Sequence, residues 1–255
     1  MRVVLSSVVV AMLAAGCTTD ESGNGTTLTV FAASSLGAVF TERIGPGFEA
    51  EHDGTTVVFN FAGSDSLAAQ IQSEGSADVF ASASGAWMDE VAADPGVTGR
   101  ADFVRNRLVI VAPADQADGG ISSIEDLAVP GVQLVLAAEG VPVGDYAREA
   151  LDAAGILDAA EANVVSNEED NASVVAKVAA EEADAGIVYA SDVSFAAGND
   201  VTAIEIAPDV NVVATYPIAV VEGSSNADLA AEFVAYVTGP HGQADLSEYG
   251  FEPVA

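Results

Sequence analysis

The chain has 255 residues, half of them hydrophobic, and carries 39 Asp and Glu against 7 Lys and Arg, a formal net charge of -32. This length and apolar content suffice for one large or two modest domains with a substantial core. The few basic residues are scattered, which excludes the basic patch of a nucleic-acid-binding protein. So acidic a surface is typical of a protein that stays hydrated in strong salt, although a compositional bias toward Ala, Asp and Glu explains it as well.

The N-terminus predicts export from the cytoplasm. One arginine, a short apolar run and small residues precede Cys17, the only cysteine. The run is too short to span a membrane, so residues 1–16 are expected to be a signal peptide. The ending Ala14-Ala-Gly-Cys17 resembles a bacterial lipobox, which implies lipidation of Cys17; a simple secretory signal is the alternative. The lone cysteine excludes an internal disulfide and a multi-cysteine metal site, and residues 17–26 are polar enough for a flexible tether.

Beyond the tether, short apolar runs alternate with amphipathic stretches, which predicts an α/β fold around a mostly parallel sheet. We expect strands at 28–31, 57–61, 78–81, 108–112, 133–137, 162–165, 185–189, 201–206 and 216–221. Helices are expected at 36–51, 65–73, 86–93, 123–127, 144–154, 171–182 and 226–238. Because no flexible linker divides the chain, the runs at 108–113 and 216–221 are expected to cross between two lobes that close around a ligand by hinge motion.

Three segments place hydroxyl side chains directly after a predicted strand: Phe31–Leu36, Phe61–Leu67 and Gly186–Asp192. In open parallel sheets, ligands bind beyond the carboxyl ends of the strands, and the helix that follows directs its unpaired N–H groups into the same space. Since no basic pocket is available, we expect an anion held by neutral donors. Ser35 and Ser64 could instead be simple helix N-caps.

The residues give little support to catalysis. His52 lies at a polar helix end and His241 in a Pro-His-Gly turn, so neither is placed to partner Ser35 or Ser64 in a triad. The chain has no Gly-x-Ser-x-Gly elbow, phosphate loop or Gly-x-Gly-x-x-Gly turn. Acidic runs such as 168–170 are expected to be solvated faces. We therefore expect a binding protein without enzymatic activity or cofactor; a surface-anchored adhesive lipoprotein is the alternative from another class.

Several motifs resemble, in the same order, the periplasmic molybdate-binding proteins of molybdate ABC transporters. They span about residues 27–251 and are Ala32-Ala-Ser-Ser-Leu36, Ser64 with Leu67-Ala-Ala-Gln-Ile71, Ala77-Asp-Val-Phe-Ala-Ser-Ala83, Val141-Pro-Val-Gly-Asp-Tyr-Ala147, Gly186-Ile-Val-Tyr-Ala-Ser-Asp192 and Tyr216-Pro-Ile-Ala-Val-Val221. The resemblance implies a two-lobed periplasmic binding protein fold of type II with its ligand in the cleft. Lobe I would comprise residues 27–108 plus 219–255, and lobe II residues 109–218.

The resemblance also implies a function outside the cytoplasm. The protein would be a monomer, anchored to the membrane through Cys17, that captures molybdate or tungstate and passes it to a permease with its ATPase. Sulfate or phosphate on the same scaffold is the alternative ligand.

The site residues follow from the same resemblance. Ser35 and Ser64 would each give a hydroxyl and a backbone N–H, Val143 and Asn171 backbone N–H groups, and Tyr189 its phenolic O–H. Asn171 replaces the hydrophobic residue of some relatives. Asp65 replaces a neutral residue of many relatives, and we expect its side chain to point outward.

Overall fold

A computed structural model describes residues 25–115, 120–194 and 200–254; the expected signal peptide, Cys17 and most of the tether lie outside them. The strands are β1 (Thr26–Ala33), β2 (Thr55–Ala62), β3 (Val79–Ala81), β4 (Val97–Pro113), β5 (Leu134–Ala137), β6 (Val164–Glu168), β7 (Ala185–Tyr189), β8 (Val201–Glu205), β9 (Val213–Val221) and β10 (Glu252–Pro253). The helices are η1 (Ser34–Leu36), α1 (Gly37–Val39), η2 (Phe40–Ile44), α2 (Gly45–Glu51), α3 (Ser64–Glu74), α4 (Gly85–Ala93), η3 (Ile124–Ala128), α5 (Pro142–Ala153), α6 (Leu157–Glu161), α7 (Asn171–Ala179), α8 (Ala190–Ser194), α9 (Ala227–Thr238) and α10 (Pro240–Glu248).

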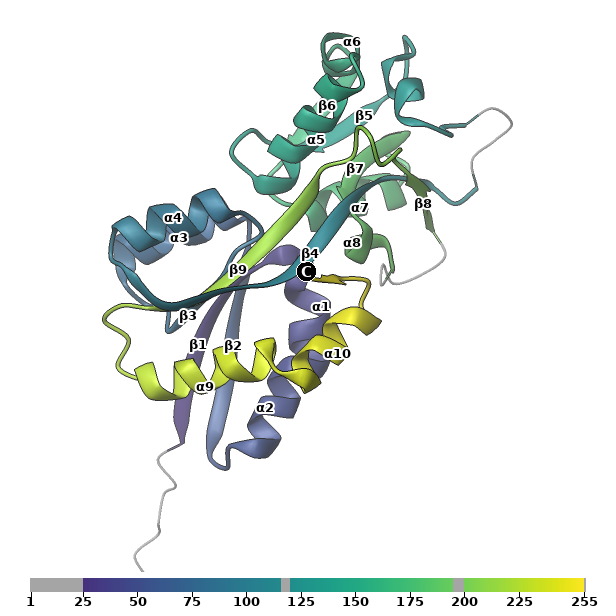
Figure 1. The fold of residues 1–255 in the computed structure, drawn as a ribbon. Coiled ribbons are helices and arrows are strands. Elements are labelled where there is room, and N and C mark those ends of the chain that lie inside the picture. The colour runs from purple at the N-terminus through teal and green to yellow at the C-terminus, as the bar shows by residue number, and fades with distance from the viewer. Residues whose placement is uncertain (1–24, 116–119, 195–199, 255) are drawn as a thin grey trace, which may run out of the picture.

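The strands form two groups joined by long antiparallel strands (Figure 1). In lobe I, β1 lies parallel to β2 and β3, and β9 runs antiparallel to β3 and β4. In lobe II, β5 lies parallel to β6 and β7, and β4 pairs antiparallel with β7 and β8. The strand β4 belongs to both groups, because it pairs with β9 as far as Arg107 and with β7 from Leu108 onward. The expected α/β fold with two lobes is confirmed.

Apolar side chains on both faces of the lobe I sheet explain its two helical layers. Successive residues of a strand point to opposite faces, and Val30 and Phe31 accordingly join different core clusters. On one face, Phe40, Phe48 and Phe233 from η2, α2 and α9 pack edge to face. The other face is covered by α3 and α4, whose buried apolar residues are Leu67, Ala68, Ile71, Met88 and Val91.

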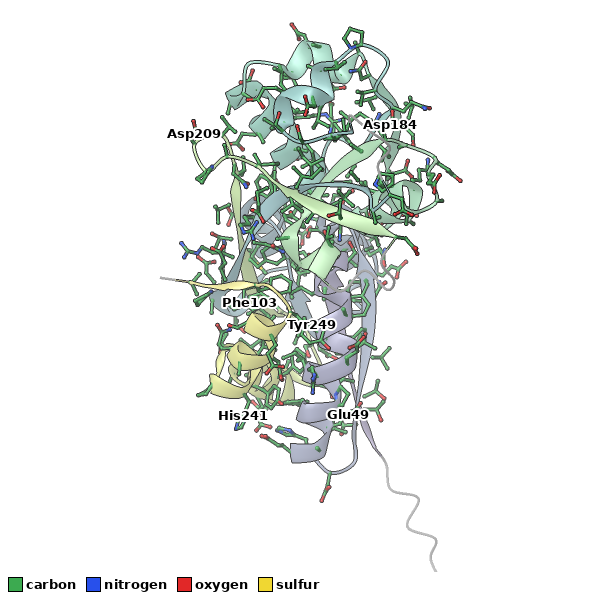
Figure 2. The ribbon with its side chains drawn as sticks, turned by 90° about the vertical axis from the view of Figure 1, so that its right-hand side faces the viewer. Glu49, Phe103, Asp184, Asp209, His241 and Tyr249 are labelled. Atoms are coloured by element: carbon green, nitrogen blue, oxygen red, sulfur yellow. The ribbon has the colours of Figure 1, made fainter. Side chains whose placement is uncertain are left out.

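The main departures from the predicted elements are β4 and α10. The strand β4 begins at Val97, well before the predicted run at 108–112. The sequence does not predict its first part, because residues 97–102 are not buried, the pairing is interrupted by register shifts and apolar residues are few. The expected Pro-His-Gly turn is wrong, since Pro240 occupies the first position of α10, where proline is tolerated, and His241 follows it in that helix (Figure 2). Gly242 permits this close helix junction, because a Cβ there would lie 2.5 Å from the Val237 carbonyl oxygen.

Candidate functional site

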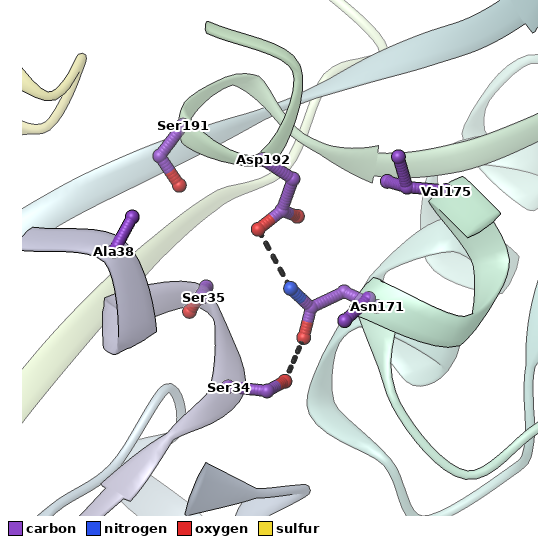
Figure 3. A pocket seen from close by; sticks show the side chains of 8 residues that line it. Ser34, Ser35, Ala38, Asn171, Val175, Ser191 and Asp192 are labelled. Atoms are coloured by element: carbon purple, nitrogen blue, oxygen red, sulfur yellow. Dashed lines mark hydrogen bonds between the residues drawn. The ribbon is translucent and has the colours of Figure 1, made fainter. Parts of the chain in front are cut away.

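A pocket of about 220 Å³ lies where the two lobes meet (Figure 3). The residues that line it come from the helical segment after β1, from the first turns of α7 and from α8, and are Ser34, Ser35, Ala38, Asn171, Ala172, Val175, Ser191 and Asp192. None of these lining residues is a lysine, an arginine or a histidine. A ligand in this pocket would therefore meet hydroxyl groups, an amide, a helix N-terminus and one carboxylate.

Ser35 is held by a hydroxyl pair rather than by helix capping. Its side-chain oxygen lies 3.0 Å from the Tyr216 hydroxyl, and the N-cap of η1 is Ala33, which makes no side-chain cap. The simple N-cap interpretation of Ser35 is therefore wrong. Burial raises the pKa of Tyr216 far above its ordinary value, so its hydroxyl stays protonated. If Tyr216 donates to Ser35, the Ser35 proton is free to point into the pocket.

Asn171 begins α7 and is 6% exposed. The Asp170 side chain caps this helix by accepting from the Ser173 N–H at 2.8 Å. The backbone N–H groups of Asn171 and Ala172 precede the first intrahelical bond, and such groups at a helix N-terminus attract anions. The Asn171 side chain makes two hydrogen bonds of its own: its oxygen accepts from the Ser34 hydroxyl, and its nitrogen donates to Asp192 at 2.6 Å (Figure 3).

Asp192 brings a carboxylate to a site that we expected to contain only donors. One carboxylate oxygen accepts from the Asn171 side chain, and the other accepts from the Tyr189 backbone N–H at 2.9 Å. Burial raises the pKa of Asp192 to about 7, although these two hydrogen bonds act in the opposite direction. The expectation of an acceptor-free site is wrong. Asp192 ends the motif Gly186–Asp192, in which the sequence singles out the hydroxyl residues alone.

Tyr189, the last residue of β7, lies next to the pocket residues rather than among them. Its ring packs against that of Tyr216, with centroids 5.7 Å apart. Burial raises the pKa of Tyr189 well above its ordinary value. Among the residues that the structure describes, its buried phenol oxygen has no hydrogen-bond partner of good geometry. An unpaired buried O–H is a group that a bound ligand can satisfy.

Ser64 and Val143 lie at helix starts, as expected, but do not line this pocket. Ser64 is the first residue of α3, and its hydroxyl oxygen accepts from the Ala83 N–H at 3.0 Å. It makes no cap, because the N-cap of α3 is Gly63. Val143 follows Pro142 in the first turn of α5, and both Ser64 and Val143 are 1% exposed. The structure thus brings Ser35 and Asn171 together, places Tyr189 beside them, and leaves these two residues outside the lining.

Asp65 does not point outward as expected. One of its carboxylate oxygens is buried and has no partner among the described residues. A Cβ on Gly63 would lie 2.4 Å from this oxygen and 3.0 Å from the carbonyl oxygen of Glu169 in lobe II. The missing side chain of Gly63 therefore leaves the space into which Asp65 folds, on the side that faces the other lobe.

Hydrogen bonds of Ser34 and Trp87 are among those that connect the lobes across the cleft. The Ser34 hydroxyl of lobe I donates to Asn171 of lobe II, and the Trp87 indole of α4 donates to the Gly140 carbonyl oxygen at 2.8 Å. Asp145 holds the Gly140 loop by accepting from the Gly140 N–H at 2.8 Å. The structure therefore shows the lobes in contact with each other. Trp87 is the only tryptophan in the sequence.

A sequence model of the family described as bacterial extracellular solute-binding protein matches residues 28–252. The chain belongs to this family. The Molybdate-binding protein ModA of Mycobacterium tuberculosis is 41% identical over 225 residues, which cover 88% of this chain and 84% of that protein. The resemblance to periplasmic molybdate-binding proteins that the motifs predicted is confirmed.

Solved structures confirm the fold of this solute-binding protein. The periplasmic molybdate-binding protein of Azotobacter vinelandii matches with a TM-score of 0.75 at 19% identity, covering 89% of this chain and all of the other. The sulfate-binding protein SubI of M. tuberculosis matches equally well, with a TM-score of 0.75 at 17% identity, covering 90% of this chain and 87% of SubI. At these identities the matches show the fold alone.

The two histidines of this solute-binding protein do not line the pocket. The His52 ring contacts the Phe48 carbonyl oxygen and the Glu232 carboxylate, and His241 lies on α10, away from the pocket. Within the described residues, no cluster of three or more His, Cys, Asp or Glu could hold a metal ion. Among those same residues, no helix has both the length and the apolar character needed to cross a bilayer.

Proposed function

We propose that this solute-binding protein captures molybdate, and also tungstate, in the cleft and delivers it to the permease and ATPase of an ABC transporter. The observation that carries the proposal is a pocket without cations, at the N-terminus of α7 and beside Ser35, in a chain whose relatives at 41% identity are named molybdate-binding proteins. The ligand is the transported solute rather than a cofactor, and the protein needs no catalytic group.

Neutral donors can hold a dianion in a chain of net charge -32 because their effect is local. A hydrogen bond to a charged acceptor contributes roughly 1.5 to 3 kcal/mol, and a helix N-terminus adds roughly 0.3 to 1 kcal/mol. Several such donors offset the desolvation of the anion and the ordering of the lobes. The long-range repulsion from the acidic surface is screened over about 8 Å at physiological salt.

We assign the binding roles as the family resemblance implies. Ser35 and Ser64 give hydroxyl and backbone N–H groups, Val143 and Asn171 give backbone N–H groups, and Tyr189 gives its O–H. Support comes from the helix starts at Ser64, Val143 and Asn171, and from the Tyr189 phenol, which has no hydrogen bond of good geometry among the described residues. Ser64 and Val143 do not line the pocket in this structure, so their contact with the anion is part of the proposal.

The arrangement favours an anion without a proton. Each oxygen of Asp192 already accepts one N–H, and the oxygen of Asn171 accepts from Ser34. An ionised Asp192 could still accept the proton of hydrogen phosphate, because each carboxylate oxygen has two lone pairs. Once Asp192 is protonated, its carboxyl offers an O–H instead, which suits molybdate, tungstate and sulfate because they bring no proton. Separation of molybdate from sulfate then depends on the size of the cavity.

Other parts of the account are also proposals. We assign residues 27–108 and 219–255 to lobe I and 109–218 to lobe II, which the exchange of β4 partners between Arg107 and Leu108 supports. We infer that the protein works as a monomer outside the cytoplasm, anchored through a lipid on Cys17. The family description as extracellular supports this location.

Thermal unfolding with added oxyanions tests the proposed function. A ligand that binds only the folded state raises the melting temperature with its concentration. We expect molybdate and tungstate to stabilise the protein, sulfate and phosphate to leave it unchanged, and Ser35→Ala to weaken the response. Ser66→Ala is the matched control, because Ser66 lies on α3 and its hydroxyl donates to Asp65. Stabilisation by sulfate or phosphate alone would keep the binding role and change the ligand; no response to any anion would refute the proposal.

A further inference from the structure

A row of three side chains crosses the cleft. The Ser34 hydroxyl in η1 donates to the side-chain oxygen of Asn171, whose nitrogen donates to Asp192 at 2.6 Å. Ser34 belongs to lobe I, whereas Asn171 begins α7 and Asp192 lies within α8, both in lobe II (Figure 3). These contacts are separate from the backbone N–H role of Asn171, because they use its side chain only.

The row fixes the orientation of the Asn171 amide. An amide presents an acceptor at one end and donors at the other, and an ionised carboxylate accepts only. Turning the amide over would place its oxygen against the Asp192 carboxylate, which is repulsive. An ionised Asp192 therefore holds the Asn171 oxygen toward lobe I, where the Ser34 hydroxyl can donate to it. A protonated Asp192 keeps this orientation while its oxygens still accept from the Asn171 side chain and the Tyr189 N–H.

Opening of the cleft would break only one bond of this row. The bonds from Asn171 and from the Tyr189 N–H to Asp192 lie within lobe II and survive a rigid movement of the lobes. The Ser34–Asn171 bond joins the lobes, and Asn171 is 6% exposed, so water competes poorly for it while the cleft is closed. This bond therefore favours the closed arrangement specifically.

We propose that Ser34 and Asn171 clasp the two lobes over the bound anion and thereby set its dissociation rate, with Asp192 as the positioning residue that orients Asn171. The proposal rests on the proposed function, since it concerns the lifetime of the anion in the same cleft. Opening of the cleft is slowed, because it must break the additional hydrogen bond between Ser34 and Asn171. Binding of molybdate to the open form is not slowed, because this bond is absent there.

Trp87 provides the signal for the test. It is the only tryptophan, and its indole donates to Gly140 across the cleft, so its fluorescence is expected to change when the lobes separate. A molybdate complex is mixed with an excess of Trp87→Phe protein, which captures released molybdate without contributing tryptophan emission. The recovery of the signal then gives the dissociation rate, and the rise at increasing molybdate gives the association rate.

The variants are Ser34→Ala, Asn171→Leu and the double variant, with Ser173→Ala on the same helix turn as the control. Losing one hydrogen bond predicts a dissociation rate raised about three- to tenfold in Ser34→Ala, with the association rate within about twofold of wild type. The double variant is expected to dissociate no faster than the faster single variant, because both changes remove the same bond. The melting temperature of the ligand-free protein checks that each variant folds.

The outcomes separate the two proposals. If wild-type protein binds no oxyanion, the proposed function and the clasp that rests on it are refuted together. If wild-type protein binds and Ser34→Ala dissociates at the wild-type rate, the clasp alone is refuted. Effects of the single variants that multiply in the double variant would also overturn it. If Asn171→Leu fails to fold, the Ser34→Ala rates decide by themselves.

Discussion

Asp192 places an ionisable carboxyl at the edge of a pocket that we expect to hold a dianion. Burial raises its pKa to about 7, the N–H groups of Tyr189 and Asn171 lower it, and the nearby Asp170 charge raises it. A bound dianion repels the ionised form further, so binding should take up a proton near neutral pH. Molybdate affinity is therefore expected to increase as the pH falls from about 8 to about 6.

The size of this effect follows from the pKa. If only the protonated form binds tightly, the affinity falls by the factor 1 + 10^(pH − pKa), which gives a change of about tenfold between about pH 6 and pH 8. This is an upper limit, since the ionised form keeps part of the affinity. The free energy of unfolding depends on pH in the same direction. Because the pKa of Asp192 in the folded state lies above the ordinary carboxyl value, the contribution of Asp192 to stability is present at low pH and falls as the pH rises from about 4 to 7.

Calorimetric titration with molybdate at several pH values measures this dependence. Repeating each titration in buffers of different ionisation enthalpy counts the protons taken up. Asp192→Asn removes the titrating group and is expected to flatten the profile, although its amide also replaces an acceptor of two N–H groups. A flat profile in the wild type, or an unchanged slope in Asp192→Asn, would refute the assignment.

Three further predictions concern residues beside and outside the pocket. Tyr216→Phe should weaken molybdate binding about three- to tenfold by removing the partner of Ser35, and should have no further effect in a Ser35→Ala background; calorimetry of the double-mutant cycle tests this. Gly144→Ala should lower the melting temperature, because its Cβ would lie 2.3 Å from the Ala138 carbonyl oxygen, whereas Gly37→Ala, whose Cβ would meet Phe61 at 3.9 Å, should not. Changing His52 and His241 to Gln together should leave the molybdate affinity within about twofold; a larger loss in the titration would contradict their placement outside the site.

Local sequence patterns predicted the elements that bury continuous apolar runs. The run at 185–189 is β7, all of whose residues are buried, and the run at 28–31 lies within β1. The first half of β4 has no such run, since none of residues 97–102 is buried and its register is irregular. Proline and glycine around His241 suggested a stop, but the same residues permit a helix to begin against α9.

The sequence predicts a site residue only where its position at the end of a strand or the start of a helix indicates a role. Ser35 and Asn171 followed from such positions and from the family motifs, and both line the pocket. The sequence placed Ser34 and Asp192 in segments expected near the site but could not predict their roles, because these arise from contacts with Asn171, which is distant in the sequence. The burial of Asp65 likewise depends on the empty space at Gly63 and on the other lobe.

The most direct test of the central claim is a calorimetric titration of the purified protein without its N-terminal tether. Molybdate and tungstate, then sulfate and phosphate, are added at low and high salt. The account predicts tight one-to-one binding of molybdate and tungstate, with no heat of binding from sulfate or phosphate. Binding of sulfate or phosphate in place of molybdate, or no binding of any oxyanion, would contradict it.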